Sequence, residues 1–215
     1  MIAEVIVQLC ILILSLFIIL FIYNLLHQST HTKSRTRSRT RTNQPNRHLA
    51  QSSRHLSRAT ATTRSTSQRA KAALSEADTA LSISPRDPSA HIHRAKALHL
   101  LGHPAAALRS LDAALSLPAS KTLTETERAE ALVKRAEVKV EVNRRRRMES
   151  AVKDLEEAVG MNGGKRIEKE ALCLLGKCYE WKGMKEEAKQ VFKKLLHLQP
   201  DSVEASNGLH RLPYS

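Results

Sequence analysis

The sequence predicts an all-α protein: a short α-α solenoid of paired helices, preceded by a single membrane-spanning helix and a basic linker. Three observations predict this fold class. The second half is rich in alanine, leucine, lysine, arginine and glutamate, which lose little rotamer freedom in a helix. Aromatic residues make up only 3% of the chain, and no alternating apolar runs typical of strands follow residue 26. Apolar positions at helical spacing recur through residues 67–202.

A short tail, residues 1–4, precedes a predicted transmembrane helix over residues 5–26. This run carries no charged side chain. A helix of that length spans roughly 33 Å, enough for a hydrocarbon core of about 30 Å. A cleaved signal peptide is disfavoured because the run is too long and lacks a basic N-terminal flank and a small-residue cleavage site. A buried core helix is disfavoured because the run is apolar on every face, and no other segment is apolar enough to enclose it.

Residues 27–66 form the predicted linker, which is basic and rich in serine, threonine and arginine. No acidic residue lies between Glu4 and Glu76, and residues 27–75 carry eleven lysines and arginines. Large apolar residues are few between about 27 and 64, so we expect this segment to be mostly disordered or weakly helical. Phosphorylation of its many hydroxyl side chains would reduce the positive charge.

The charges that flank the apolar run predict its orientation. Five basic residues lie within fifteen positions after Leu26, and none precedes Val5. Basic flanks stay in the cytosol, so the C-terminal domain is expected to be cytosolic, with the linker attracted to anionic lipid headgroups. We expect insertion at the endoplasmic reticulum, with an organelle outer membrane as the alternative. A nucleic-acid-binding role for the arginine-serine segment is disfavoured, because no RNA-recognition motif accompanies it.

The clearest repeat runs from Lys169 to Ser202. Its apolar and small residues recur three and four apart, as expected for two helices that each bury one face. Gly183 fits the turn between the two helices, and Pro200 cannot continue the second helix because it lacks the backbone N–H. The residues that define this pattern are Leu172, Leu175, Gly176, Tyr179, Ala188, Phe192 and Leu195.

This segment resembles a tetratricopeptide repeat (TPR), a motif of 34 residues, with Leu195 in place of a small residue. The pattern recurs less sharply upstream, so the resemblance implies a right-handed superhelix of stacked helix pairs. We expect a short capping helix from Val203 to Leu209 within the C-terminal segment, residues 203–215, with Asp201 and Ser202 at its start. The predicted repeat units are a leading helix at 67–85 and repeats at 88–120, 129–162 and 169–202.

The sequence contains no catalytic constellation. It has no glycine-rich phosphate loop, no paired-histidine zinc motif and no nucleophile elbow, so we predict that the protein is not an enzyme. The ten histidines are scattered along the chain. We therefore predict no catalytic, metal-binding or cofactor-binding residue, and no cofactor.

The resemblance implies a groove, lined by the first helix of each pair, that binds a peptide or protein segment. Carrying the family's groove positions onto this chain gives nine candidates: Ile92, Lys96, His99, Val133, Glu137, Val140, Cys173, Lys177 and Glu180. A TPR subclass grips the C-terminal carboxylate of heat-shock chaperones with lysine, asparagine and arginine. The matching positions here hold other residues, such as Ile92 and Glu130, so a chaperone-tail receptor is disfavoured.

Four consecutive arginines, Arg144, Arg145, Arg146 and Arg147, follow Asn143 in the predicted turn of the third copy. Four neighbouring positive charges repel one another unless an anion lies close to them. A solvated loop is one interpretation, and contact with an anionic partner or lipid headgroup is the other.

These observations predict a membrane-anchored interaction module, an adaptor or receptor that binds a protein or peptide through the TPR groove on the cytosolic side. Its expected partners are that protein or peptide and the membrane, and no nucleic acid. The alternative is an auxiliary subunit of a membrane enzyme or translocase complex, contacted through the transmembrane helix.

Overall fold

The computed structural model describes residues 44–61, 65–116 and 118–212. The chain divides into two compact units, Met1–Gln44 and Pro45–Ser215, and almost all of the described residues belong to the second. The predicted transmembrane helix at 5–26 and the first part of the linker lie outside the described residues. Within the part that is described, no helix has both the length and the apolar character needed to cross a bilayer.

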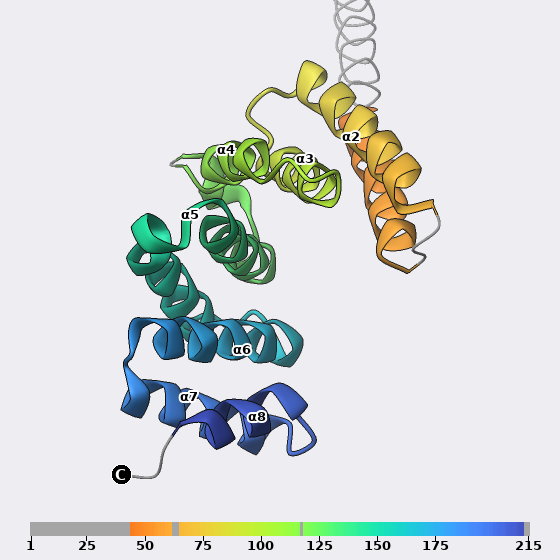
Figure 1. The fold of residues 1–215 in the computed structure, drawn as a ribbon. Helices are drawn as coiled ribbons and strands as arrows, with labels where there is room; N and C mark the ends of the chain where they lie inside the picture. The colour runs from red at the N-terminus through yellow and green to blue at the C-terminus, as the bar shows by residue number, and fades with distance from the viewer. Residues whose placement is uncertain (1–43, 62–64, 117, 213–215) are drawn as a thin grey trace, which may run out of the picture. The chain divides into compact units, whose positions relative to one another are not determined.

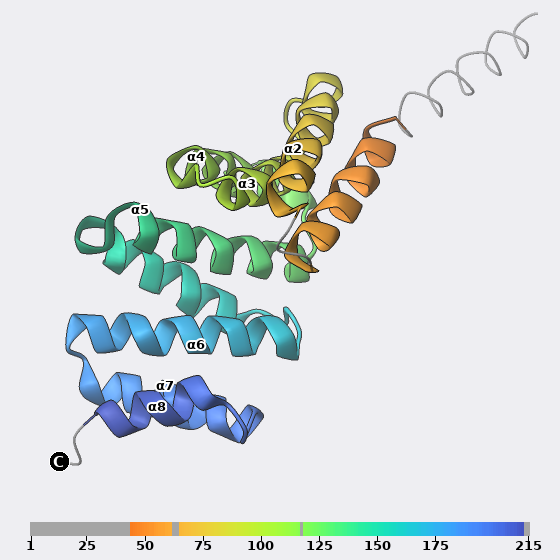
Figure 2. The same ribbon diagram turned by 45° about the vertical axis from the view of Figure 1, so that its right-hand side comes forward.

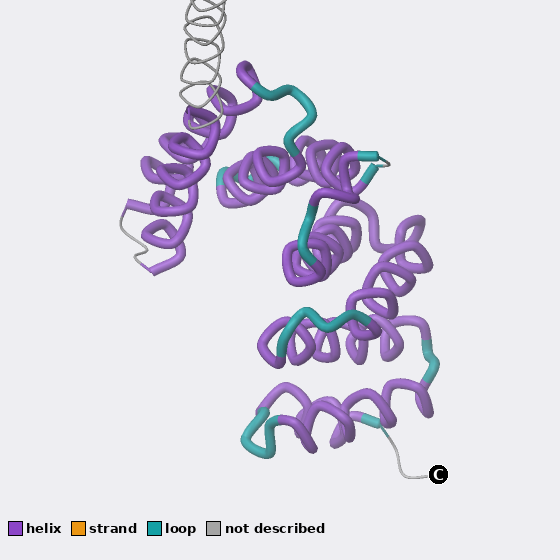
Figure 3. Tube along the Cα trace, turned by 180° about the vertical axis from the view of Figure 1, so that it is seen from behind, coloured by secondary structure: helices purple, strands orange, loops and turns teal. Residues whose placement is uncertain are grey.

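The described residues are helical throughout, with short connections and no strand (Figures 1 and 3). A helix over residues 44–61 comes first, drawn in orange in Figure 1. The elements that follow are α2 (Thr66–Ile83), α3 (Pro88–Leu100), α4 (Pro104–Leu115), the 3₁₀ helix η2 (Ala119–Thr122), α5 (Glu125–Gly160), α6 (Lys165–Lys182), α7 (Lys185–Leu198) and α8 (Val203–Arg211).

Each helix packs mainly against its neighbours in sequence, so the unit is a stack of helix pairs, as Figure 2 shows for α5, α6 and α7. The predicted helix pair at 169–202 is present as α6 and α7, and α6 begins four residues earlier, at Lys165. Gly183 takes the left-handed conformation, φ 76°, that ends α6. Gly102 does the same, φ 78°, in the turn between α3 and α4. Both turns favour glycine because it has no Cβ.

The helix at 44–61 lies in the segment that the sequence predicted to be mostly disordered or weakly helical. This helix buries Leu56 and Ala59, at 7% and 2% exposure, against α2 and its neighbours. The hydroxyl of the fully buried Ser52 donates to the carbonyl of Ala73 at 3.0 Å. The expected lone leading helix therefore has a partner, and the described residues contain four helix pairs.

Close packing in this first pair depends on small side chains. Four alanines at spacings of three and four lie along α2 with no exposed surface: Ala70, Ala73, Ala77 and Ala80. An alanine stripe lets two backbones approach more closely than leucine would, so α2 contributes only alanines to the fully buried part of the seam.

The third pair also differs from its prediction, because its two helices are joined without a loop. Helix α5 continues from Glu125 to Gly160 and breaks only at Asn143, whose φ of −160° and ψ of 91° are not helical. The side chain of Asn143 then accepts a hydrogen bond from the backbone N–H of Arg146 at 3.0 Å. The arginines predicted to lie in a turn therefore form the first turn of the second half of α5.

A buried ionic network joins the two halves of α5. Asp154, with 6% of its side chain exposed, accepts two hydrogen bonds from the guanidinium of Arg135, at 2.7 and 2.9 Å. The ammonium of Lys139 donates to the same carboxylate at 2.7 Å and to the carbonyl of Ser150 at 3.1 Å. Because all three charges are paired, their burial does not leave an uncompensated ion.

The last helix, α8, begins at Val203, where the sequence predicted the start of a short capping helix, and it ends at Arg211. Ser202 precedes α8, and its hydroxyl accepts from the backbone N–H of Ala205 at 3.3 Å. Phe192 of α7 has no exposed surface and lies between Gly176 of α6 and Gly208 of α8. A Cβ at either glycine would come within 2.5 Å of the phenyl ring, so only glycine permits this three-helix contact.

Candidate functional site

A groove lies on the face formed by the helix at 44–61, α3, the first half of α5, and α6. We call it the inner groove; it encloses about 430 Å³. No residue of α2, α4 or α7 lines it, so it belongs to the first helix of each pair. Its lining residues are Leu56, Ser57, Thr60, Lys96, Leu100, Glu130, Val133, Lys134, Glu137, Arg166 and Glu170.

Ion pairs cross the inner groove between the first helices of neighbouring helix pairs. Lys96 of α3 donates to Glu130 of α5 at 2.9 Å, and Arg166 of α6 lies 3.8 Å from the same carboxylate. Arg166 also pairs with Glu170 at 2.7 Å. These side chains are a quarter to two thirds exposed, so each pair stabilises the fold by only about 0.2–1 kcal/mol. A ligand can therefore replace them at small cost.

The groove also has an apolar part, in which Leu100 is half-buried while Leu56 and Val133 are mostly buried, at 7% and 9% exposure. Leu56, Leu100 and Val133 come from three different helices and line the same hollow as the charged residues. Ser57 and Thr60 of the helix at 44–61 also line it, and their hydroxyls donate to carbonyls of their own helix. An apolar surface with a few polar groups and charges of both signs suits a polypeptide segment with mixed side chains.

A second hollow, of about 640 Å³, continues from the inner groove and shares Glu137 with it. We call it the arginine hollow. It lies between the break in α5 and the C-terminal part of α6. Its lining residues are Glu137, Val140, Glu141, Val142, Asn143, Arg144, Arg145, Leu174 and Trp181.

Four of the nine predicted groove residues line these hollows. Lys96, Val133 and Glu137 meet in the inner groove, and Val140 lies in the arginine hollow. Lys96 is already paired with Glu130, and Glu137 accepts from Lys134 at 2.8 Å.

The other five predicted groove residues line neither hollow. Ile92 is 5% exposed and belongs to the core, and Cys173 packs against the C-terminal core. His99 bonds to Glu141 at 2.6 Å. Glu180 accepts two hydrogen bonds from Arg211 of α8, which lower the pKa of its carboxyl below the ordinary value. The fifth residue, Lys177, is half-buried on α6.

Residues that the sequence prediction missed complete the inner groove. Leu56, Ser57 and Thr60 were missed because their segment was expected to be mostly disordered or weakly helical. Arg166 was missed because α6 begins before the repeat motif does. Residue pairs three and four apart, such as Glu130 with Lys134, are the signal that could have found the charged positions.

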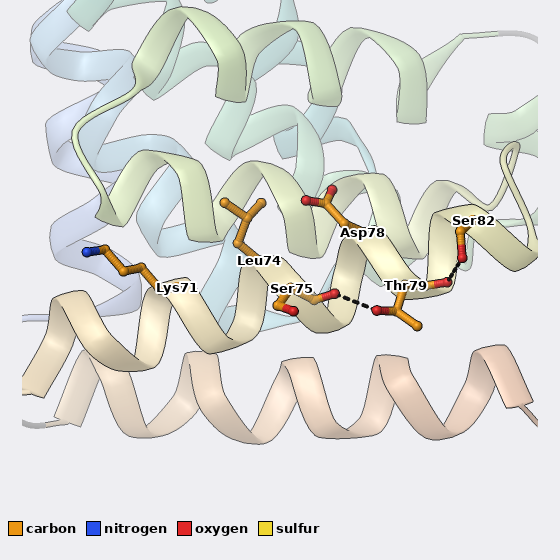
Figure 4. A pocket seen from close by; sticks show the side chains of 6 residues that line it. All are labelled: Lys71, Leu74, Ser75, Asp78, Thr79 and Ser82. Carbon is orange, nitrogen blue, oxygen red and sulfur yellow. Dashed lines mark hydrogen bonds between the residues drawn. The ribbon is translucent and has the colours of Figure 1, made fainter.

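A third hollow, of about 490 Å³, lies along α2 and carries no comparable set of groups (Figure 4). The hydroxyls of Thr79 and Ser82 donate to the carbonyls of Ser75 and Thr79, at 2.8 and 2.7 Å. Asp78 accepts from Arg94 at 2.8 Å. Since these polar groups are satisfied within the helix and by its neighbour, this hollow is a surface irregularity between packed helices.

The described residues contain no cluster of histidine, cysteine, aspartate and glutamate that could hold a metal ion. Burial raises the pKa of the Cys178 thiol to about 11, so this cysteine is a poor nucleophile at neutral pH. Burial also lowers the pKa of His93, which favours its neutral form.

Comparison with known proteins agrees with this architecture. A family model described as a tetratricopeptide repeat matches residues 170–202. This segment is therefore similar to a tetratricopeptide repeat. A search of curated proteins found no match to the chain.

Solved structures extend the likeness to the whole TPR-like stack. The MamA protein superposes with a TM-score of 0.61 and 16% identity, over 79% of this chain and 80% of that one. Pseudomonas aeruginosa PilF gives a TM-score of 0.62 and 19% identity, over 80% and 70%. YrrB, described as a TPR protein with an unusual peptide-binding site, gives 0.54 and 20%, over 66% and 67%. At these identities the likeness shows the fold, and the predicted all-helical TPR-like solenoid is confirmed.

Proposed function

We propose that the chain is a membrane-anchored adaptor or receptor that binds a protein or peptide segment in the inner groove. Proteins with the TPR fold generally mediate protein–protein interaction, and YrrB carries a peptide-binding site by its description. The observation that supports the proposal most strongly is the composition of the inner groove. It combines three apolar side chains with ion pairs that are weak enough to be replaced.

The groove favours an extended or helical segment that carries an apolar side chain and charges of both signs. Three cations and three carboxylates line it: Lys96, Lys134, Arg166, Glu130, Glu137 and Glu170. A segment with complementary charges replaces ion pairs within the protein by ion pairs between the protein and the segment. This exchange fixes the register of the bound segment and contributes more to specificity than to affinity. Burial of its apolar side chain against Leu56, Leu100 and Val133 supplies the affinity.

The membrane part of the proposal rests on the sequence. Residues 5–26 form an uncharged apolar run long enough to span a bilayer, and the basic residues lie on its C-terminal side. These features favour a cytosolic inner groove held near the endoplasmic reticulum or an organelle outer membrane. The proposed role is binding, with no catalytic step.

Proximity labelling from the C-terminus in living cells tests both parts. The labelled proteins identify the compartment and the neighbours of the full-length chain. A variant with Ser57→Arg and Thr60→Arg fills the groove with two long cations at exposed positions, where we expect the fold to tolerate them. Ser82→Arg with Asn207→Arg, at exposed positions on α2 and α8 outside the groove, is the matched control.

The proposal predicts that the groove variant loses specific neighbours that the wild type and the control keep. Identical labelling in all three would contradict groove binding. Release of the full-length chain from membranes by alkaline carbonate would separately contradict the anchor, because a spanning helix resists that wash.

A further inference from the structure

We propose that the arginine hollow is a second docking site, which binds an acidic peptide segment of a partner protein. The proposal goes beyond the inner groove and does not depend on it. It rests on three observations: unpaired arginines, an exposed tryptophan stacked with one of them, and a hollow with an apolar wall.

The arginines stand in an electrostatically unfavourable place. Arg144, Arg145 and Arg146 are exposed in the first turn of the second half of α5. The N-terminus of a helix carries partial positive charge, so a cation there is less favourable than a neutral residue. No ion pair within the described part of the chain involves the four arginines at 144–147. An anion bound at this place would relieve both the mutual repulsion and the unfavourable helix dipole.

Trp181 provides a contact surface beside these charges. It is the one tryptophan of the sequence, and 44% of its surface is exposed. The guanidinium carbon of Arg144 lies 4.3 Å from the centre of its indole ring. This stacking holds the guanidinium in place while its edge stays free to donate to a carboxylate. Tryptophan and arginine are also the residues that most often dominate binding energy at protein interfaces.

The shape of the hollow favours a peptide over a flat lipid surface. Val140, Leu174 and Trp181 line it, so it accepts an apolar side chain between the charges. Glu137 and Glu141 also line it, and they are paired with Lys134 and His99. Carboxylates beside the arginines disfavour a continuous anionic bilayer, whereas a peptide can place its acidic groups at the arginines alone.

The occupant is therefore a short segment with neighbouring acidic residues and one apolar side chain. Two carboxylates can pair with Arg144 and Arg145, and the apolar side chain can pack on Leu174 and Trp181. Electrostatic attraction makes the association fast and sensitive to salt.

Fluorescence anisotropy of a labelled synthetic peptide, made of glutamates with one central leucine, tests the proposal. The peptide is titrated with the full-length chain in a mild nonionic detergent. We expect saturable binding, and loss of about tenfold or more in affinity for the Arg144→Gln, Arg145→Gln double variant. The matched control removes the same charge at exposed positions elsewhere, Arg86→Gln with Arg109→Gln, and should bind as the wild type does. Far-UV circular dichroism confirms the fold of each variant.

Two outcomes would overturn the proposal. Equal weakening in both double variants would show that the peptide responds only to net charge. Phosphatidylserine added to the detergent micelles provides the second test. If this lipid shifts the emission of Trp181 and the peptide does not bind saturably, the site is a lipid contact.

Discussion

The contact of Phe192 with two glycines yields a quantitative prediction. In Gly208→Ala the new Cβ would lie 2.5 to 2.8 Å from three ring atoms of Phe192, which has no exposed surface. Overpacking of this kind costs about 1–3 kcal/mol. Replacing glycine with alanine inside a helix stabilises the helix by about 1 kcal/mol, which offsets part of this loss. We therefore expect Gly208→Ala to lower the free energy of unfolding by up to about 2 kcal/mol.

The opposite side of the ring sharpens this prediction. A Cβ at Gly176 would meet the other edge of Phe192, again at 2.5 Å. In either single variant the ring can relax toward the remaining glycine, but in the double variant it cannot. The double variant should therefore lose more than the sum of the two single losses, with a coupling of about 0.5–3 kcal/mol.

Equilibrium urea unfolding of the full-length chain in mild detergent, followed by far-UV circular dichroism, measures these differences. Gly160→Ala is the matched control, because Gly160 lies at the end of α5 and nothing approaches within 4 Å of its Cβ position. We expect this control to be neutral or stabilising. If Gly176→Ala and Gly208→Ala both stabilise the chain as the control does, the three-helix contact at Phe192 is wrong.

Three further predictions concern charges and a thiol. Asp154→Asn leaves two partly buried cations without their carboxylate, so it should lower the free energy of unfolding by about 3 kcal/mol or more. Asp112→Asn removes the carboxylate of a more exposed pair and should lower that free energy by less than about 1 kcal/mol. Urea unfolding of the two variants measures both values. The pKa of Glu180 is lowered by its hydrogen bonds to Arg211, so this pair stabilises α8 above the ordinary carboxyl pKa. That stability is lost as the pH falls through the lowered pKa. Pepsin cleavage of α8, divided at each pH by cleavage of an unstructured reference peptide, should therefore increase through that acidic range. Arg211→Gln should remove this normalised pH dependence, and equal normalised pH dependence in both proteins would refute this. Burial raises the pKa of Cys178 to about 11, so iodoacetamide should modify it at pH 8 only in urea, as peptide mass mapping would show; rapid native labelling would contradict its burial.

The sequence was most informative where large apolar residues recur at helical spacing. Leu172, Leu175 and Phe192 are all buried, as their spacing predicts, and the pair they define is present as α6 and α7. The helix at 44–61 was expected to be weakly helical at most, and its seam contains Ser52, a polar residue in a fully buried position. The hydroxyl of Ser52 can be buried because it donates a hydrogen bond to the carbonyl of Ala73. A search for apolar residues at helical spacing does not detect such a buried polar position.

The site was predicted less completely because tertiary contacts decide which side chains remain available. Glu180 occupies a family groove position but is engaged by Arg211 of the capping helix. The arginines at 144–147 were placed in a turn because paired helices usually need one, whereas a single non-helical residue, Asn143, suffices here. Their stacking on Trp181 joins positions far apart in sequence, which spacing alone does not reveal.

Site-specific photo-crosslinking tests the central proposal, groove binding, most directly. A photoreactive residue in place of Ser57, on the inner groove, is compared in cells with one in place of Asn207, on the exposed side of α8. The account predicts a discrete crosslinked protein from the groove position that is absent from the α8 position. It also predicts that the crosslink disappears when Thr60→Arg fills the groove. Crosslinks of equal yield and identity from both positions, unaffected by that substitution, would contradict it.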